Sequence, residues 1–587
     1  MHILGLNAWH GDSSAARLTD GQLAFAIEEE RLNRIKHWAG FPSLAADACL
    51  AGVDRSQVEH VAIGRNTRAN LLRKLLYVAI TPAAFSMALK RLRNTAKVAS
   101  LPSMLADLGL AHAQVHFVEH HRAHLASAFF ASPFEEAAVV SLDGFGDFSS
   151  AMWGAGRGNA INIRGGVRFP HSLGIFYSAF TQILGFPKYG DEYKMMGLAA
   201  FGKPIYADKI RKIIHLDSDQ ICLDLRFFVH HSSGTEMSWE GGEPVVGRIY
   251  SDLMSAEFGP VRDSHEDLSP RHADLAASVQ AVFEEIYFGY LRFVAKVTGL
   301  KKVCLAGGVA LNCAANGKIF SETPFKDVFI QPASHDAGIS IGAALHVAHI
   351  ELGKPRCFVM RHACWGPEYS DADIKKSLDA AGIIYTAHAE PDLLRQTAEA
   401  IASGLVIGWF QGRMEFGPRA LGGRSILADP RRSDMKDILN IRIKRREAFR
   451  PFCPSVAAEG TGKYFEIDYP SPFMVQAYRI RPEMRAILPA VTHEDGTGRL
   501  QTVEKEVNPR YWGLLKAFEK VAGLPILINT SFNENEPIVN TPQQAIDCFL
   551  RTRMDALVIG SYIARQADNL PLVGRPRGEA QGSGTFD

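Results

Sequence analysis

The sequence predicts an α/β fold, and three similar segments spread along the chain support this prediction. Apolar runs at residues 3–7, 139–142 and 303–306 each lead into a turn rich in glycine or small polar residues. Such runs are typical of buried strands. The chain of 587 residues is too long for one ordinary domain, and its length favours about two to four domains. A hydrophobic fraction of 47% with 22% charged residues is typical of a soluble globular protein.

The first expected elements are a strand at residues 3–7, a polar turn at 10–16 and a second strand-like run at 23–26. The turn carries His10 and Asp12. A strand, a small polar turn with an acid and another strand resemble the start of actin-like and sugar-kinase-like ATPases, the ASKHA fold. This resemblance implies two related lobes with a nucleotide between them.

A basic block follows, because no Asp or Glu occurs between Val61 and Ala106. Its cations surround an aliphatic run at residues 75–80 and are Arg65, Arg68, Arg73, Lys74, Lys90, Arg91, Arg93 and Lys97. One interpretation is a partly apolar lip that attracts an anionic or lipid-bearing acceptor, or a partner protein. The other is an insertion with a solvated basic face, which we favour.

Two histidines four residues apart, His120 and His124, predict a metal site. Side chains at i and i+4 of a helix project from one face, so two imidazoles can converge on one cation. Asp143 and Asp336 follow strand-like runs and can complete the ligand shell. A histidine pair alone is more often a surface or core feature. We expect the glycine-containing turns after Leu142 and Ala306 to open helices whose backbone N–H groups approach phosphate.

One domain boundary is predicted after residue 354. A helical run at 341–352 ends at Gly353 and Pro355, and Ser370 can cap the next helix. We therefore expect a domain at residues 1–354, a second domain at 355–574 and a flexible tail at 575–587, which is polar and rich in glycine.

Composition excludes several functional classes. The net charge of +1 gives no general reason to expect nucleic acid as a partner. The eight cysteines contain no C-x-x-C pair, so neither a zinc knuckle nor a disulfide scaffold is indicated. We find no leader segment and no apolar run of the roughly 18 residues that a membrane span requires. A cytoplasmic location is the expectation.

Four longer motifs carry a family resemblance over almost the whole chain. They lie at residues 28–37, 190–199, 307–312 and 449–455. In this order they resemble the O-carbamoyltransferases of antibiotic and nodulation-factor biosynthesis. The resemblance implies that a C-terminal YrdC-like domain makes carbamoyl adenylate and pyrophosphate from carbamoyl phosphate and ATP with Mg(II). An actin-like N-terminal domain then passes the carbamoyl group to a hydroxyl. The resemblance further implies a bound metal, iron in this family, on His120, His124, Asp143 and Asp336.

Site residues are carried over by motif. The resemblance assigns binding of nucleotide or carbamoyl phosphate to Asp191, Lys194, Gly307, Gly308, Asn312, Arg419, Lys444, Arg450, Arg499, Ser531 and Asn533. Catalytic roles are expected for His10, Asp12 and Lys36. Either His10 or Asp12 can take the hydroxyl proton, and we prefer His10 because an imidazole titrates near neutral pH. Mixed nitrogen and oxygen ligation suits iron(II), manganese or zinc, and iron rests on the resemblance.

Two other classes of function compete with small-molecule O-carbamoylation. Similar domains serve tRNA threonylcarbamoylation and the synthesis of a hydrogenase ligand, although the latter type normally adds an acylphosphatase-like start and cysteine-rich zinc elements. An actin-like or chaperone-like ATPase switch would not need the basic C-terminal loops. The sequence leaves open the acceptor and the subunit number, for which a homodimer is one option.

Overall fold

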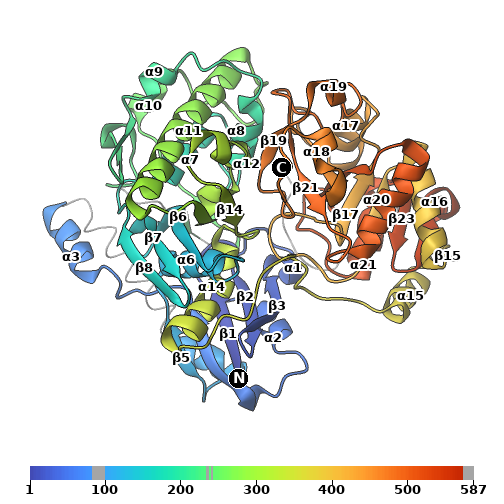
Figure 1. The fold of residues 1–587 in the computed structure, drawn as a ribbon, viewed down its shortest axis with the longest axis horizontal. Helices are drawn as coiled ribbons and strands as arrows, with labels where there is room; N and C mark the ends of the chain where they lie inside the picture. Colours follow the sequence, from blue (N-terminus) through green and yellow to red (C-terminus); the bar gives the residue numbers. More distant parts are fainter. Residues whose placement is uncertain (82–99, 233–236, 239–241, 573–587) are drawn as a thin grey trace.

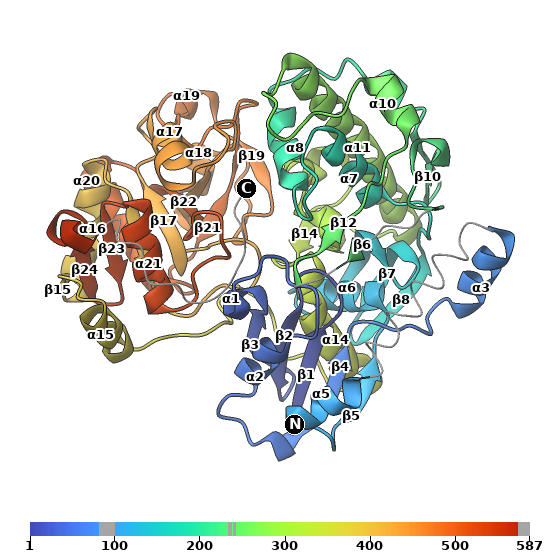
Figure 2. The same ribbon diagram turned by 180° about the vertical axis from the view of Figure 1, so that it is seen from behind.

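The computed structural model describes residues 1–81, 100–232, 237–238 and 242–572. Within them, two lobes with five-stranded sheets precede an α/β domain with an eight-stranded sheet (Figures 1 and 2). The first sheet has the order β3-β2-β1-β4-β5 and comprises β1 (His2–Asn7), β2 (Ser14–Thr19), β3 (Gln22–Glu28), β4 (Val58–Ile63) and β5 (Gln114–Phe117). The strands expected at 3–7 and 23–26 are confirmed.

The second lobe repeats this topology. Its sheet has the order β14-β13-β6-β7-β8 and comprises β6 (Glu136–Gly146), β7 (Ser149–Arg157), β8 (Ala160–Gly165), β13 (Lys302–Ala306) and β14 (Asp327–Ile330). In both sheets the first three strands form an antiparallel meander, and the last two add in parallel to the other side of the first strand. Two lobes with the same strand order confirm the actin-like fold.

Two helices pack between the lobes. α14 (Ile339–His346) contacts the first sheet, α6 (His120–Phe129) contacts the second, and the two helices contact each other. Glycines permit this approach, because a Cβ on Gly5 would lie 1.9 Å from the Ser340 carbonyl oxygen. A Cβ on Gly342 would lie 1.9 Å from the Ala123 carbonyl oxygen. The second lobe also carries α7 (Leu173–Ile183), α8 (Glu192–Ala199) and the long α11 (Pro270–Thr298).

The prediction that the turn after Leu142, which begins with Asp143, opens a helix is wrong. Strand β6 continues to Gly146 and reverses directly into β7 through a two-residue turn. Asp147 and Phe148 form this turn with φ angles of 48° and 75°. Positive φ at both central residues matches the twist of a tight hairpin, so the chain pairs with itself rather than entering a helix. The turn after Ala306 does lead through a 3₁₀ turn into α12 (Cys313–Asn316).

The C-terminal domain is a mixed α/β unit, as expected for a YrdC-like domain. Its sheet has the order β15-β24-β23-β16-β17-β22-β18-β21 and comprises β15 (Thr386–Ala387), β16 (Ile407–Phe410), β17 (Arg424–Ala428), β18 (Cys453–Ala457), β21 (Gln501–Val503), β22 (Ile526–Ser531), β23 (Ala556–Ile559) and β24 (Tyr562–Arg565). Its main helices are α15 (Asp371–Ala380), α16 (Glu390–Ala402), α20 (Pro509–Ala522) and α21 (Pro542–Thr552).

The segment between the domains begins and ends as the sequence indicates. Helix α14 ends in a π-turn at Val347–Glu351, and Gly353 takes a φ of 64°. Ser370 forms a capping box at the start of α15. Phe358 and Met360 nevertheless pack into the core of the N-terminal lobes, so the boundary at 354 stays a prediction.

Two regions of the expected organisation fall wholly or partly outside the described residues. The predicted tail at 575–587 and the basic residues between 82 and 99 lie outside the described residues. The described part of the basic block contains α3 (Leu71–Ile80), which stands out from the edge of the second lobe (Figures 1 and 2). A search of the described residues for a helix with the length and apolar character of a membrane span found none.

Candidate active site

Four side chains from both lobes converge beside the N-terminus of α6. Nε2 of His120 lies 3.0 Å from Oδ2 of Asp143, and Nε2 of His124 lies 3.4 Å from the same oxygen. Oδ1 of Asp336 lies 3.8 Å from Nε2 of His120 and 3.6 Å from Nε2 of His124. The four donor atoms lie within 4.8 Å of one another. We call these residues the metal quartet.

The chemistry of the metal quartet fits a divalent cation. Burial opposes charge on His120, yet Asp143 and Asp336 raise its pKa to about 9. Burial and the nearby Asp143 raise the pKa of Asp336. Two carboxylates are thus crowded together, and Nε2 of His124 is buried without a hydrogen-bond partner. A cation would balance the carboxylates and use the free imidazole nitrogen, because buried charges are stable when they are paired or bind metals.

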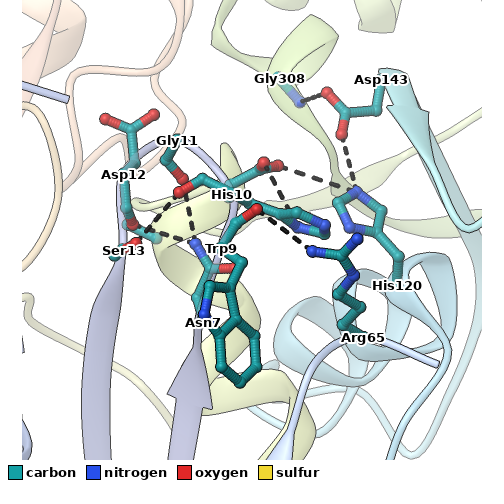
Figure 3. Close-up of polar contacts among 12 residues, drawn as sticks. Asn7, Trp9, His10, Gly11, Asp12, Ser13, Arg65, His120, Asp143 and Gly308 are labelled. Carbon is teal, nitrogen blue, oxygen red and sulfur yellow. Dashed lines mark hydrogen bonds and ion pairs between the residues drawn. The ribbon is translucent and has the colours of Figure 1, made fainter. Parts of the chain in front are cut away.

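Backbone groups hold the metal quartet in place. The N–H of Gly308 donates to Oδ1 of Asp143 over 3.0 Å, which leaves Oδ2 directed at the histidines (Figure 3). Oδ2 of Asp147, at the hairpin tip, accepts from the N–H of His120 over 3.0 Å. The Glu119 side chain caps α6 by accepting from the N–H of Arg122. The first turn of α6 is therefore fixed from two sides.

His10 lies against the metal quartet, as Figure 3 shows. Its Nδ1 is 4.0 Å from Oδ2 of Asp336, and its ring centroid is 5.1 Å from that of His120. Burial and the positive charge of Arg65 hold the pKa of His10 well below its usual value. Arg65 is held in turn by the carbonyl of Trp9, at 3.3 Å. The imidazole of His10 is therefore neutral, and its lowered pKa makes it a weaker base than the near-neutral titration expected from the sequence would imply.

Asp12 has a different environment from His10. Its Oδ1 lies 2.7 Å from Nδ1 of His37, and its Oδ2 accepts from the hydroxyl of Tyr189 over 3.4 Å. Burial opposes ionisation, but His37 and His335 lower the pKa of Asp12 to about 2. Burial likewise opposes charge on His37, whose pKa the carboxylate of Asp12 raises to about 9. Asp12 is therefore an ion-paired carboxylate.

The other predicted residues of the N-terminal lobes lie in several environments. Lys194 forms an ion pair of 2.8 Å with Asp191 at the start of α8. Lys36 is exposed, with Arg450 of the C-terminal domain among its charged neighbours. Asn312 caps α12 and also exchanges hydrogen bonds with Gln280, so its amide is already engaged within the protein.

Four arginines of the C-terminal domain gather where it meets α8 and α12. We call Arg419, Arg446, Arg450 and Arg499 the arginine cluster. Arg499 donates to Sγ of Cys453 over 2.8 Å, and Arg450 donates to the hydroxyl of Tyr193 on α8 over 3.0 Å. Burial and the neighbouring Arg499 lower the pKa of Arg419 to about 10.

The positive charge of the arginine cluster is only partly compensated. Burial and the neighbouring Arg450 lower the pKa of Arg446 to about 10. The Nε atoms of Arg419 and Arg450 are buried without a hydrogen-bond partner, although Arg450 forms an ion pair with Glu447. Guanidinium groups crowded together with unused donors suit a phosphate-bearing ligand, which accepts several hydrogen bonds at once.

Lys444, Ser531 and Asn533 meet at the end of β22. The Lys444 ammonium donates to the backbone carbonyl and side-chain oxygen of Asn533, each over 2.7 Å, and to the carbonyl of Ser531. Burial and the charge of Arg446 hold the pKa of Lys444 well below its usual value. The three predicted residues therefore form one buried polar group.

The loop that carries Arg419 is fixed by two acidic residues. A carboxylate oxygen of Glu415 accepts from the N–H groups of Leu421 and Gly423 at 2.6 and 2.7 Å. Glu28 of the first lobe accepts from the N–H of Gly417 over 2.7 Å, and Arg31 donates to the carbonyl of Gly417. The N-terminal lobes thus contact the phosphate-binding candidates of the C-terminal domain directly.

Sequence reasoning missed several residues of this region. They are His37, Arg65, Tyr189, His335 and Arg446. His37, Tyr189 and His335 stand next to predicted residues or inside quoted motifs, so adjacency to Lys36, Gly190 and Asp336 was an available signal. Arg65 was named only as part of the basic block, and Arg446 stands among several basic residues that gave no reason to single it out.

Comparison with known proteins gives two family matches. The family described as "Carbamoyltransferase N-terminus" matches residues 2–345, and "Carbamoyltransferase C-terminus" matches residues 398–566. An uncharacterized protein of Synechocystis is 40% identical, with 96% of each chain covered. Nodulation protein NolNO of Sinorhizobium fredii is 39% identical over 96% of this chain and 80% of that protein. A 3'-hydroxymethylcephem-O-carbamoyltransferase of Amycolatopsis lactamdurans is 31% identical over 63% of this chain and 64% of that enzyme.

Proposed function

Since the chain belongs to the carbamoyltransferase family, we propose that it is an ATP-dependent O-carbamoyltransferase with a small-molecule natural product as acceptor. It would use carbamoyl phosphate, ATP and one water to make carbamoyl adenylate. Water would cleave carbamoyl phosphate to carbamate and phosphate, and a carbamate oxygen would then attack the α-phosphorus of ATP and displace pyrophosphate. The carbamoyl group would then move to an acceptor hydroxyl, with AMP as the leaving group. One observation carries this proposal. The N-terminal lobes hold the metal quartet beside a neutral His10, and the C-terminal domain holds a separate arginine cluster.

The arginine cluster supports the first step. Carbamoyl phosphate and the ATP triphosphate bring several negative charges into one site, and fixed cations reduce their repulsion. Arg450 and Arg499 are held by hydrogen bonds to Tyr193 and Cys453 before any ligand binds. Their charges need not reorganise as pyrophosphate departs. Lys444 is a charged neighbour of Arg446, and its hydrogen bonds hold Asn533 in place.

The metal quartet and His10 support the second step. When bound to His120, His124, Asp143 and Asp336, a divalent ion such as iron(II) would supply positive charge for the adenylate phosphate. Nδ1 of His10 is buried without a hydrogen-bond partner, so its neutral ring can accept the acceptor's hydroxyl proton at this atom. Arg65 holds the Trp9 carbonyl and thereby fixes the turn that carries His10.

Mutation should separate the two steps. Arg499→Ala removes a cation of the arginine cluster, and Lys444→Ala removes the support of Ser531 and Asn533. We expect release of pyrophosphate in the presence of carbamoyl phosphate to fall about 10²-fold or more. Transfer from supplied carbamoyl adenylate should survive. Arg510→Ala, a partly exposed arginine that pairs with Glu390 in the same domain, is the control. Normal pyrophosphate release in both Arg499→Ala and Lys444→Ala would contradict the proposed roles of the domains.

Metal content tests the quartet independently of activity. His124→Ala should lose the bound ion, because it removes one of the four donor atoms that lie close enough together to share a cation. His121→Ala is the matched control, since His121 is equally buried on α6 but directs Nδ1 to the hydroxyl of Ser141 at 2.9 Å. Elemental analysis of the purified proteins decides the question. Stoichiometric metal in His124→Ala would exclude this histidine as a ligand. Adenylate formation should continue in both variants.

A further inference from the structure

Helix α3 exposes an unusual amount of apolar surface. The exposed fractions of its large aliphatic side chains are 83% for Leu72, 69% for Ile80, 61% for Leu76, 59% for Leu75 and 51% for Leu71. Figures 1 and 2 both show α3 standing out from the second lobe. Single exposed leucines are common on protein surfaces, but five on one ten-residue helix form a continuous patch.

The exposed aliphatic residues occupy one side of α3. At about 100° per residue, positions 71, 72, 75, 76 and 80 fall within one half of the helix surface. Tyr77 lies on the other half and contacts the body of the protein. Its ring centroid is 5.1 Å from that of Phe169 and 5.8 Å from that of Phe148, and its hydroxyl donates to the carbonyl of His231. An ordinary surface helix turns its apolar side to the core, whereas α3 is anchored through Tyr77 with its apolar side outward.

The charges around α3 are of one sign. Arg68 and Arg73 are exposed, and Lys74 lies half-buried on the side away from Leu76. No Asp or Glu occurs in the sequence between Val61 and Ala106. Aliphatic residues on one side with flanking cations are the features of helices that lie in the interface of an anionic bilayer. The leucines would enter the acyl boundary while the cations stay level with the headgroup phosphates.

We propose that α3 attaches this protein to the surface of an anionic phospholipid membrane. A second copy of the chain is a poorer occupant, because two α3 helices would bring the exposed Arg68 and Arg73 of both copies together. The attachment is peripheral, and α3 is separate from the residues that carry the proposed reaction. The start of α3 is nevertheless connected to the metal quartet. Asn66 and Asn70, just before α3, both donate to Asp147, which also accepts from the N–H of His120.

Vesicle flotation with the full-length protein tests this proposal. We expect the protein to float with vesicles of phosphatidylcholine and phosphatidylglycerol, and to stay unbound with phosphatidylcholine alone. Leu72→Glu/Leu76→Glu should reduce binding about tenfold or more, because it places acids in the apolar patch. The matched control is Ile205→Glu/Ile384→Glu, which changes two isoleucines that are 64% and 60% exposed elsewhere. Arg68→Gln/Arg73→Gln should lower binding and its dependence on salt.

Three results would overturn the proposal. The first is equal binding of the α3 variant and the control to anionic vesicles, and the second is no binding of the wild-type protein. The third is a concentration-dependent dimer in sedimentation experiments that Leu72→Glu/Leu76→Glu abolishes while vesicle binding is unchanged, which would assign the patch to a second copy. Carbamoyl transfer to a water-soluble acceptor should be equal in all variants, which separates this test from that of the proposed reaction.

Discussion

The ion pair between Asp12 and His37 makes stability depend on pH at the scale of single residues. The pKa of His37 is raised to about 9, so the folded state holds its proton more tightly than an unfolded chain with the ordinary value of 6.5. Its stabilisation is therefore fully present below pH 6.5 and is lost as the pH rises through about 9. A third of the His37 side chain is exposed, and solvent screening limits the contribution to about 1–2 kcal/mol.

His37→Gln should consequently lower the thermal midpoint at pH 6 and have little effect at pH 9.5. Thermal unfolding of both proteins at these pH values measures the difference. The Asp12 carboxylate, with its pKa lowered to about 2, contributes stability above pH 3.8 that disappears as the pH falls through about 2. An equal destabilisation at pH 6 and pH 9.5 would show that the imidazolium charge is not the cause.

The β6–β7 hairpin positions the start of α6 at the scale of elements. Oδ2 of Asp147 accepts from the N–H groups of both His120 and Asn66, at 3.0 and 2.8 Å. Asp147→Ala should therefore loosen the first turn of α6 and weaken metal binding about 10–100-fold, as other supporting groups of metal sites do. Asp147→Asn keeps a carbonyl oxygen as acceptor and tolerates the positive φ, so it should restore most of the affinity. Competition with a chelator measures the effect. Equal affinity in the alanine and asparagine variants would exclude this role.

Local patterns predicted elements better than their connections. The spacing of His120 and His124 predicted a helix with both imidazoles on one side, and Ser370 predicted the start of α15. The turn after Asp143 was misjudged, because Asp147 and Phe148 adopt positive φ without a glycine to announce it. The environment of Arg446 could not be predicted either, since its charged neighbours include Tyr193 of the second lobe, which is distant in the sequence. Likewise, the repeated strand order of the two lobes has no repeat in the sequence.

At the scale of the whole molecule, the balance of charge argues against a nucleic acid as acceptor. The net charge is +1, and the arginine cluster is half-buried at one place rather than spread over a surface that could follow a phosphate backbone. We expect tRNA binding no tighter than about 10⁻⁴ to 10⁻⁶ M at physiological salt, the level of non-specific association. A titration at two salt concentrations measures this. Submicromolar binding that weakens steeply with salt, together with carbamoylation of the RNA, would favour the tRNA-modifying alternative.

The packing of α14 on the first sheet also determines when the first lobe can fold during synthesis. The strands of this sheet are complete by Phe117, but the helix that covers it begins at Ile339. Gly5 has no side chain because the Ser340 carbonyl occupies that space, and Ser14 donates a hydrogen bond to the hydroxyl of Ser340. A ribosome must therefore translate more than 200 further residues before the first lobe can bury its inner face. The part of the chain that is synthesised first is completed late, and until then its apolar strands depend on the protection that chaperones give to nascent chains.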